Sequence, residues 1–481
     1  MKSKALIIIL ILWSGLATSQ TVVHFDFDTC VNSSYMGNGV QWDPYQLDYG
    51  HGRMHITEDE WAKIYRRLDF MRPQLIRVVH NTAELIHDNR LNAEGNFDQV
   101  SHILNYCQKR GVTVVFGDWG WGLADAKTGT YDKKKVEMAA DYVTWLVKDK
   151  GYSCIKYYNM INEPNGYWST TEGNYELWRD ITLCFYNRLK RNNMLTHVQL
   201  VGADLAIWTP AEVSWQQRAA KEIDLGLYDI HTYPSKITVN SGEYSRIIRA
   251  YKDAVPMGRQ IVMGEVGLKF VEPADSLYQQ ENLRRAATLS YASMDDSQMF
   301  VFDYMYGTDM ADVLMQTANE GYSGCVAWML DDAMHSAEKA DKLKMWGFWN
   351  ILGDEFFGSD QEEIRPWFYA WSLLTRYMPA GCNVYRTEVS GDVAVKALAV
   401  EKNGRRMLAV LNVSKKPQNV LLKGSIVIPN CKRFDYAERR LRISSVNILD
   451  PNEQNLTLNL IEGETLEMPG ESLVIINDFD D

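Results

Sequence analysis

Two glutamates stand at the ends of short apolar runs that have the character of buried strands. Glu163 closes the run in Tyr157–Pro164 (YYNMINEP), and Glu265 closes the run in Ile261–Gly267 (IVMGEVG). Retaining glycoside hydrolysis needs a carboxylic acid and a carboxylate about 5–5.5 Å apart, flanking one glycosidic bond. The two groups must differ in their surroundings, because one is protonated while the other is ionised. Asn-Glu-Pro by itself also fits a strand that ends in a turn, so it is the pair of glutamates that indicates this chemistry.

The elements that would position this pair are eight apolar, β-branched runs that alternate with amphipathic segments. Continuous apolar strands separated by helices predict a parallel sheet covered on both faces. A capping box at Thr57–Glu60 begins one helix, and Gly111 ends another. Eight units favour a closed (β/α)8 TIM barrel over an open doubly wound sheet, the alternative, and strand ends then meet at one mouth. The runs are Gly39–Trp42, Leu75–His80, Val112–Gly117, Ile155–Ile161, Val198–Ala203, Leu227–His231, Gln260–Glu265 and Ser323–Met329.

The sequence changes character after the last helical pattern, which is followed by Pro379 and Gly381. Beyond that point, strand-like runs alternate with turn residues, and no helical pattern is found. We therefore predict a barrel domain over residues 20–380 and a small antiparallel β-sandwich over residues 381–481. Thr21–Asp28 (TVVHFDFD) alternates like a half-buried strand and could add to the sandwich.

Five further residues in or just after the predicted strands fit the same chemistry. They are Arg77 in LIRVVH, Asn162, His231 and Tyr233 in YDIHTYP, and Trp328 in VAWMLD. Taken with the two glutamates in strand order, the sequence resembles a clan A retaining glycoside hydrolase. That superfamily includes the family 5 cellulases and mannanases. The resemblance covers the whole mature chain in architecture, and its motifs are short.

The resemblance implies a role for each matching residue. Glu163 would be the acid/base and Glu265 the nucleophile, and Asn162 would bind the sugar 2-hydroxyl. Tyr233, in the His-x-Tyr pattern of strand six, would hydrogen-bond the nucleophile. Trp328 would form the floor beneath the sugar in the −1 subsite. Without the glutamates, a barrel-mouth histidine or a core tryptophan would be an equally good interpretation of such positions.

Arg77 also has a physical reason to lie beside Glu265. An arginine directed into a barrel is costly unless it is paired, and the carboxylate of Glu265 would satisfy it. The guanidinium would in turn favour the ionised form of Glu265.

Aromatic residues are abundant in the segments that follow the predicted strands. Exposed aromatic rings suit the apolar faces of sugar rings, although packing between loops and helices is the alternative for roughly half of these residues. We predict that Trp42, Trp119, Trp121 and Trp168 contact substrate. The remaining aromatic residues of these segments are Tyr167, Trp208, Trp346 and Trp349.

These features together predict a β-glycoside hydrolase, and the many aromatic loops favour an endo-β-glycanase acting on glucan or mannan. An exo-acting β-glycosidase is the close alternative, because the long segment Phe270–Tyr322 could wall off one end of a cleft. A non-catalytic carbohydrate-binding protein is the competing class. A carbohydrate is the expected partner, and the sequence does not indicate an oligomeric state.

The composition and the N-terminus limit the other possibilities. The chain has 481 residues and a formal charge of −12, so binding of nucleic acid through a basic face is not expected. Residues 1–19 combine two lysines, an apolar run too short for a membrane span and small residues before Gln20. We predict a signal peptide cleaved near Ser19/Gln20 and a secreted or periplasmic protein.

The metal-ligating residue types form no convincing site. His51 and His55 are four residues apart, but Gly50 and Gly52 favour a loop there, and no metal or cofactor is predicted. The seven cysteines leave at least one thiol unpaired within the chain. Cys382 and Cys431 could pair, and the pairing is otherwise open among Cys30, Cys107, Cys154, Cys184 and Cys325.

Overall fold

The computed structural model describes residues 20–45, 55–335, 342–444 and 448–480. Its larger part is a closed barrel of eight parallel strands that follow one another around the barrel in chain order. This confirms the predicted (β/α)8 barrel and excludes the open sheet. The barrel strands are β2 (Gly39–Gln41), β3 (Leu75–His80), β6 (Thr113–Asp118), β9 (Ile155–Asn159), β10 (Gln199–Ile207), β11 (Leu225–Thr232), β12 (Gln260–Val266) and β13 (Cys325–Ala327).

Helices cover the outside of the barrel, and their ends follow local sequence signals. Thr57 and Glu60 form the capping box that begins α1, and Gly111 ends α2 in the left-handed conformation, with φ of 68°. The helices are α1 (Glu58–Met71), α2 (Phe97–Arg110), α3 (Lys133–Thr144), α4 (Tyr175–Arg191), α5 (Val213–Glu222), α6 (Lys236–Asn240), α7 (Glu243–Asp253), α8 (Ser276–Thr288), α9 (Tyr304–Asn319), α10 (Gly353–Phe357) and α11 (Trp367–Tyr377).

A second, mostly antiparallel sheet of nine strands follows the barrel. Strand β1, from the start of the chain, lies between β14, to which it is antiparallel, and β17, to which it is parallel. This places the segment predicted as an alternating strand within the C-terminal sheet. The strands are β1 (Thr21–Asn32), β14 (Asn383–Ser390), β15 (Val395–Lys402), β16 (Arg405–Asn412), β17 (Gln418–Gly424), β18 (Val427–Tyr436), β19 (Glu453–Asn459), β20 (Glu464–Met468) and β21 (Ser472–Asn477).

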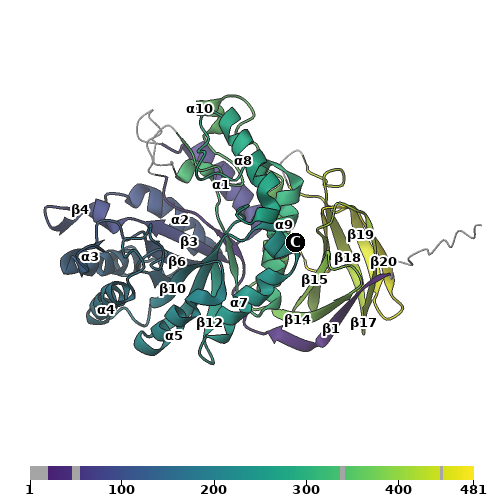
Figure 1. Cartoon of the computed structure of the whole chain (residues 1–481), viewed down its shortest axis with the longest axis horizontal. Helices are drawn as coiled ribbons and strands as arrows, with labels where there is room; N and C mark the ends of the chain where they lie inside the picture. Colours follow the sequence, from purple (N-terminus) through teal and green to yellow (C-terminus); the bar gives the residue numbers. More distant parts are fainter. Residues whose placement is uncertain (1–19, 46–54, 336–341, 445–447, 481) are drawn as a thin grey trace, which may run out of the picture.

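Helix α9 joins the two parts of the molecule. It packs against β13 of the barrel and against β14, β15, β16 and β21 of the sheet. Figure 1 shows α9 near the centre of the view, next to β14 and β15. Its residues 305–318 are all buried, because neighbours surround the helix on every side. Two short hairpins, β4 (Ile86–His87) with β5 (Arg90–Leu91) and β7 (Ala124–Asp125) with β8 (Thr130–Tyr131), complete the strands.

All seven cysteines are free thiols. Cys382 packs in the core that the barrel shares with the neighbouring sheet face, whereas Cys431 packs in the separate core within the sheet. Because the two thiols belong to different cores, the pairing of Cys382 with Cys431 that the sequence left open is wrong. His51 lies outside the described residues, and His55 is exposed. Over the described ranges, no helix is both long and apolar enough to cross a membrane.

Candidate active site

A cleft of about 840 Å³ opens at the carboxyl ends of the barrel strands, and both glutamates line it. One carboxylate oxygen of Glu163 lies within 4.8 Å of one carboxylate oxygen of Glu265. Retaining glycosidases hold their two carboxyl groups about 5–5.5 Å apart, whereas inverting enzymes need about 6.5–9.5 Å to admit a water molecule. The separation in this cleft therefore fits double displacement through a covalent intermediate.

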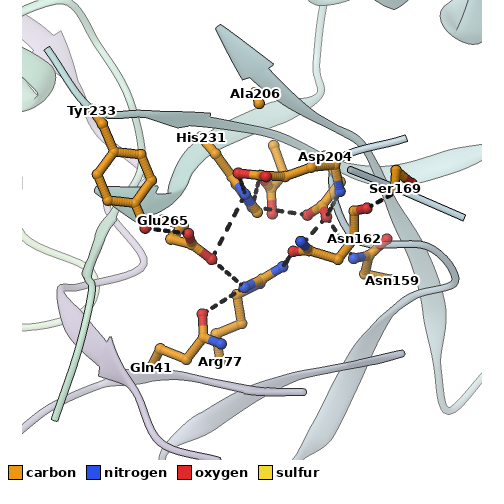
Figure 2. A network of polar contacts seen from close by, with 12 residues as sticks. Gln41, Arg77, Asn159, Asn162, Ser169, Asp204, Ala206, His231, Tyr233 and Glu265 are labelled. Carbon is orange, nitrogen blue, oxygen red and sulfur yellow. Dashed lines mark hydrogen bonds and ion pairs between the residues drawn. The ribbon is translucent and has the colours of Figure 1, made fainter. Parts of the chain in front are cut away.

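Glu265, at the end of β12, is surrounded by three groups that favour its charge. Arg77 donates from Nη1 to Oε2 at 2.8 Å, and the hydroxyl of Tyr233 donates to Oε1 at 2.5 Å (Figure 2). Nδ1 of His231 lies 3.8 Å from Oε2. Arg77 thus pairs with the carboxylate that the sequence suggested for it. Burial nonetheless raises the pKa of Glu265, and His231 and Arg77 limit that rise.

Glu163 follows β9 in a different environment. Its Oε2 accepts a hydrogen bond from the indole Nε1 of Trp168 at 2.5 Å, and its Oε1 lies 3.1 Å from Nδ1 of His231. Its backbone adopts the left-handed conformation, with φ of 46°, which an L-residue takes up only when its surroundings hold it there. The guanidinium of Arg77 and the phenol of Tyr233 thus contact only Glu265 of the pair, the indole of Trp168 contacts only Glu163, and the imidazole of His231 lies nearer Glu163 than Glu265. The two carboxyl groups can therefore differ in protonation.

The other residues of the predicted site lie in the same region. Asn162 lines the cleft, and its Oδ1 accepts from Nη2 of Arg77 at 2.6 Å, which orients the amide so that its NH2 remains a donor. Trp328 also lines the cleft, with 6% of its surface exposed. His335 stacks on its ring at 5.3 Å between centroids, and Trp119 meets its edge at 6.4 Å.

Of the tryptophans predicted to contact substrate, Trp119, Trp121 and Trp168 line the cleft, and Trp42 does not. Trp42 is fully buried and packs against Trp61. Side chains alternate along β2, so that Gln41 reaches Arg77 in the barrel interior while Trp42 packs among the rings of α1 and α2. The prediction for Trp42 is therefore wrong. Trp346 and Trp349 are also buried, whereas Tyr167 and Trp208 are exposed and line the cleft.

The sequence did not indicate two buried acids that lie near the glutamates beside His231, Asp204 on β10 and Asp229 on β11. Both lie close to Nε2 of His231, at 3.0 and 3.5 Å. Burial raises the pKa of Asp229 well above its usual range, and the neighbouring Asp204 adds to that rise. The available signal was an acid within an apolar strand run, which is rare unless the acid has a partner.

His231 lies between these acids and the two glutamates. Burial alone would lower the pKa of His231, but the carboxylates around it, led by Asp204, raise it well above its usual value. Over the described residues, two groups of side chains have ligand atoms close enough to hold a cation, and both include His231. They are Glu163, His231 and Glu265, and Asp204, Asp229 and His231. The guanidinium of Arg77 already supplies a positive charge to both groups, 2.8 Å from Glu265 and 3.3 Å from Asp204.

The two sides of the cleft differ in chemistry. Exposed aromatic side chains follow β6, β9 and β10, which are neighbours in the barrel: Trp121, Tyr167, Trp168 and Trp208. Charged and ionisable side chains follow β12, β13 and β2 on the opposite side: Asp43, Lys269, Asp295, Asp296, His335 and Lys344. Asp295 and Asp296 belong to the long segment between β12 and β13, which under the exo-acting alternative could wall off one end of the cleft. Glu163 lies on the aromatic side and Glu265 on the charged side.

The environment of Glu265 leads to a pH prediction. A nucleophile must be ionised, and Glu265 takes up a proton as the pH falls through its raised pKa. We expect kcat/KM to fall on the acid side at a higher pH than an ordinary glutamate would give. Arg77→Gln removes a neighbouring cation, raises this pKa further and should move the acid limb to higher pH. A profile of kcat/KM against pH measures the shift, and Arg188→Gln on the outer face is the control. An acid limb that does not move in Arg77→Gln would refute the assignment of this limb to Glu265.

Comparisons with known proteins come from structure alone. No family model matches the sequence, and no curated protein is detectably similar to it. Among solved structures, a GH30 endoxylanase from Clostridium papyrosolvens C71 has a TM-score of 0.63 at 12% identity, over 95% of this chain and 100% of that one. A GH39 β-xylosidase from Caulobacter crescentus has a TM-score of 0.59 at 12% identity, over 95% of this chain and 99% of the other.

A structure described as an arabinofuranosidase is similar to the same degree. Its TM-score is 0.62 at 11% identity, over 95% of this chain and all of the other. These neighbours are clan A glycoside hydrolases. At such low identity the likeness shows the fold, which here includes the barrel and the C-terminal sheet together.

Proposed function

We propose that this protein is a retaining β-glycoside hydrolase that cleaves β-linked glycans with Glu265 as nucleophile and Glu163 as acid/base. The observation that carries the proposal is the approach of the two carboxylates to within 4.8 Å inside a cleft at the barrel mouth. Their contrasting partners support the division of roles. The shared fold of clan A glycoside hydrolases adds support at the level of architecture.

The reaction proceeds in two displacements. Glu265 attacks the anomeric carbon while Glu163 gives its proton to the glycosidic oxygen, so the C–O bond breaks and a glycosyl ester forms. Glu163, now a carboxylate, then takes a proton from a water molecule that attacks the same carbon. The ester bond breaks, Glu265 is regenerated, and the product keeps its anomeric configuration. Arg77 and Tyr233 hold the nucleophile in place through both steps.

The aromatic side of the cleft supports an extended substrate. Glu163 protonates the leaving group and lies on the aromatic side, so the departing part of the glycan would pass over Trp121, Trp168 and Trp208. Several exposed rings along one side of the cleft suit a polymer better than a single sugar. An endo-β-glycanase acting on glucan or mannan therefore remains our first proposal, and the N-terminal segment supports a secreted or periplasmic location.

An exo-acting β-glycosidase is the second candidate, for a specific reason. The segment between β12 and β13 brings Asp295 and Asp296 to the cleft, and Asp296 pairs with Lys344 at 2.9 Å. Such a wall on the side of the nucleophile would limit the number of sugars that bind before the cleavage point. Several structural neighbours are xylanases or β-xylosidases, so xylan belongs among the substrates to be tested.

Product analysis with a panel of glycans tests the proposal. The protein is incubated with β-glucans, mannans, galactans and xylans, and the products are separated by chromatography. A ladder of oligosaccharides from one polymer is the expected result and names the substrate. Release of a monosaccharide alone would favour the exo-acting enzyme. Binding without any product, on polymers and aryl β-glycosides alike, would instead support a non-catalytic carbohydrate-binding protein.

The aromatic side can be tested with Trp121. This side chain is 52% exposed and stacks on Trp119 at 5.3 Å, so it offers one open face to a sugar ring. Trp121→Ala is expected to raise KM for the polymer about 10-fold with kcat within about threefold, because it removes binding that substrate and transition state share. Steady-state kinetics would show this, with the exposed Leu277→Ala on α8 as control. An unchanged KM would mean that the polymer does not bind over Trp121.

A further inference from the structure

Asp204 contacts the backbone of Glu163 and also Arg77 and His231, the two side chains that lie beside Glu265. We propose that Asp204 is a positioning residue that fixes the backbone of the acid/base Glu163 and ties it to the cations that face the nucleophile. The inference rests on the proposed function and adds to it a residue that does not itself reach the substrate. Asp204 is fully buried and does not line the cleft.

A single oxygen of Asp204 accepts from three donors, one on β3 and two on or just after β9. Oδ2 accepts from Nδ2 of Asn159 at 2.6 Å and from Nη2 of Arg77 at 3.3 Å (Figure 2). It also accepts from the backbone N–H of Glu163 at 3.1 Å. Three donors on one carboxylate oxygen define its position, and the carboxylate in turn defines theirs.

The contact with the backbone of Glu163 explains how the acid/base keeps an unusual conformation. Glu163 has a φ of 46°, and its amide N–H would be buried without a partner if Asp204 were absent. A buried donor without an acceptor is costly, and the left-handed conformation of a non-glycine residue is costly as well. The carboxylate of Asp204 offsets both costs and so sets the direction in which the side chain of Glu163 leaves the backbone.

The second oxygen of Asp204 faces His231, whose other ring nitrogen faces both glutamates. Oδ1 lies 3.0 Å from Nε2 of His231, while Nδ1 of the same ring lies 3.1 Å from Glu163 and 3.8 Å from Glu265. Arg77 connects Asp204 to Glu265 in the same way through its guanidinium. The other titratable group that faces this ring is Asp229, at 3.5 Å.

Two substitutions separate the functions of the carboxylate. Asp204→Asn keeps an oxygen that can accept from Glu163 N–H and removes the negative charge between Arg77 and His231. Asp204→Ala removes the acceptor as well. Asn tolerates the left-handed conformation in which Asp204 lies, with φ of 59°, so Asp204→Asn is the variant that keeps the local backbone.

The experiment compares leaving groups, because a displaced general acid matters only when the leaving group needs a proton. We would measure kcat/KM for the 2,4-dinitrophenyl and phenyl β-glycosides of xylose, glucose, mannose and galactose. Asp204→Ala is expected to lose about 100-fold on the phenyl glycosides and at most about 10-fold on the dinitrophenyl glycosides. Asp204→Asn should lose about 10-fold on the former and less than about threefold on the latter.

Asp312→Asn is the matched control, since Asp312 is equally buried, lies in α9 and bonds to Gln316 away from the cleft. Equal losses on both leaving groups, or no loss in a folded variant, would overturn the inference. If Asp204→Ala does not fold, Asp204→Asn alone decides, by the ratio of its loss on phenyl glycosides to its loss on dinitrophenyl glycosides. Failure of the proposed function has a separate signature: the wild-type protein would hydrolyse neither class of glycoside nor any glycan.

Discussion

Glu265→Ala is expected to lower kcat by on the order of 10⁵-fold on any glycoside that the wild-type protein hydrolyses, because alanine has no carboxylate with which to form the glycosyl ester. Arg77 and Tyr233 both donate to this carboxylate, so in the variant they face an empty space beside the anomeric carbon. A small anion can enter that space and act in place of the carboxylate. Azide should therefore restore turnover and give a glycosyl azide of inverted configuration.

The identity of the rescued product decides the assignment of Glu265. An inverted azide means that the anion attacked from the side that the missing carboxylate occupied. A retained azide from Glu265→Ala would instead assign the nucleophile to another residue. Glu222→Ala, the same substitution on the outer helix α5, is the control for general effects on folding and should keep wild-type turnover.

Glu163→Ala is expected to have the second largest effect, a loss of about 10³-fold in kcat/KM on substrates with poor leaving groups. Trp168 and His231 hold this carboxyl group from two sides, and the alanine that replaces it has no proton to give to the leaving oxygen. Dinitrophenolate leaves without protonation, so dinitrophenyl glycosides should react at nearly the wild-type rate in the first step. The comparison of leaving groups by steady-state kinetics measures the difference.

Azide also separates the two glutamates. In Glu163→Ala the glycosyl ester still forms on Glu265, so azide should attack that ester and give a product of retained configuration. Equal losses on good and poor leaving groups would contradict the role of Glu163 as acid/base. Opposite azide stereochemistry in the two alanine variants is the pattern that a single structural defect would not produce.

Hydrophobic pattern was sufficient to predict the barrel, because each parallel strand is buried on both faces and appears as a continuous apolar run. The fifth run shows where this reasoning fails. The sequence predicts that it ends at Ala203, whereas β10 continues through an acid to Ile207. The acid is Asp204, and the strand tolerates it because Asn159, Arg77 and His231 meet it there. Partners from three distant segments are invisible to a local pattern.

The aromatic residues also show that a local pattern does not reveal the partners of a side chain. Trp42 and Trp121 both follow barrel strands, and nothing in their immediate sequence separates a core residue from one that lines the cleft. The side on which Trp42 lies depends on Gln41, whose side chain points inward to Arg77. Side-chain alternation then turns Trp42 outward to the helices. The loop that carries Trp121 instead leaves its ring 52% exposed.

The stereochemistry of the first product tests the central claim most directly. The wild-type protein is mixed with its best substrate from the glycan and aryl glycoside panels, and the anomeric protons are followed by NMR from the first turnovers. Because the two carboxylates lie within 4.8 Å of one another, the account predicts that the β-anomer appears first and then mutarotates. Initial appearance of the α-anomer from a β-glycoside would contradict it.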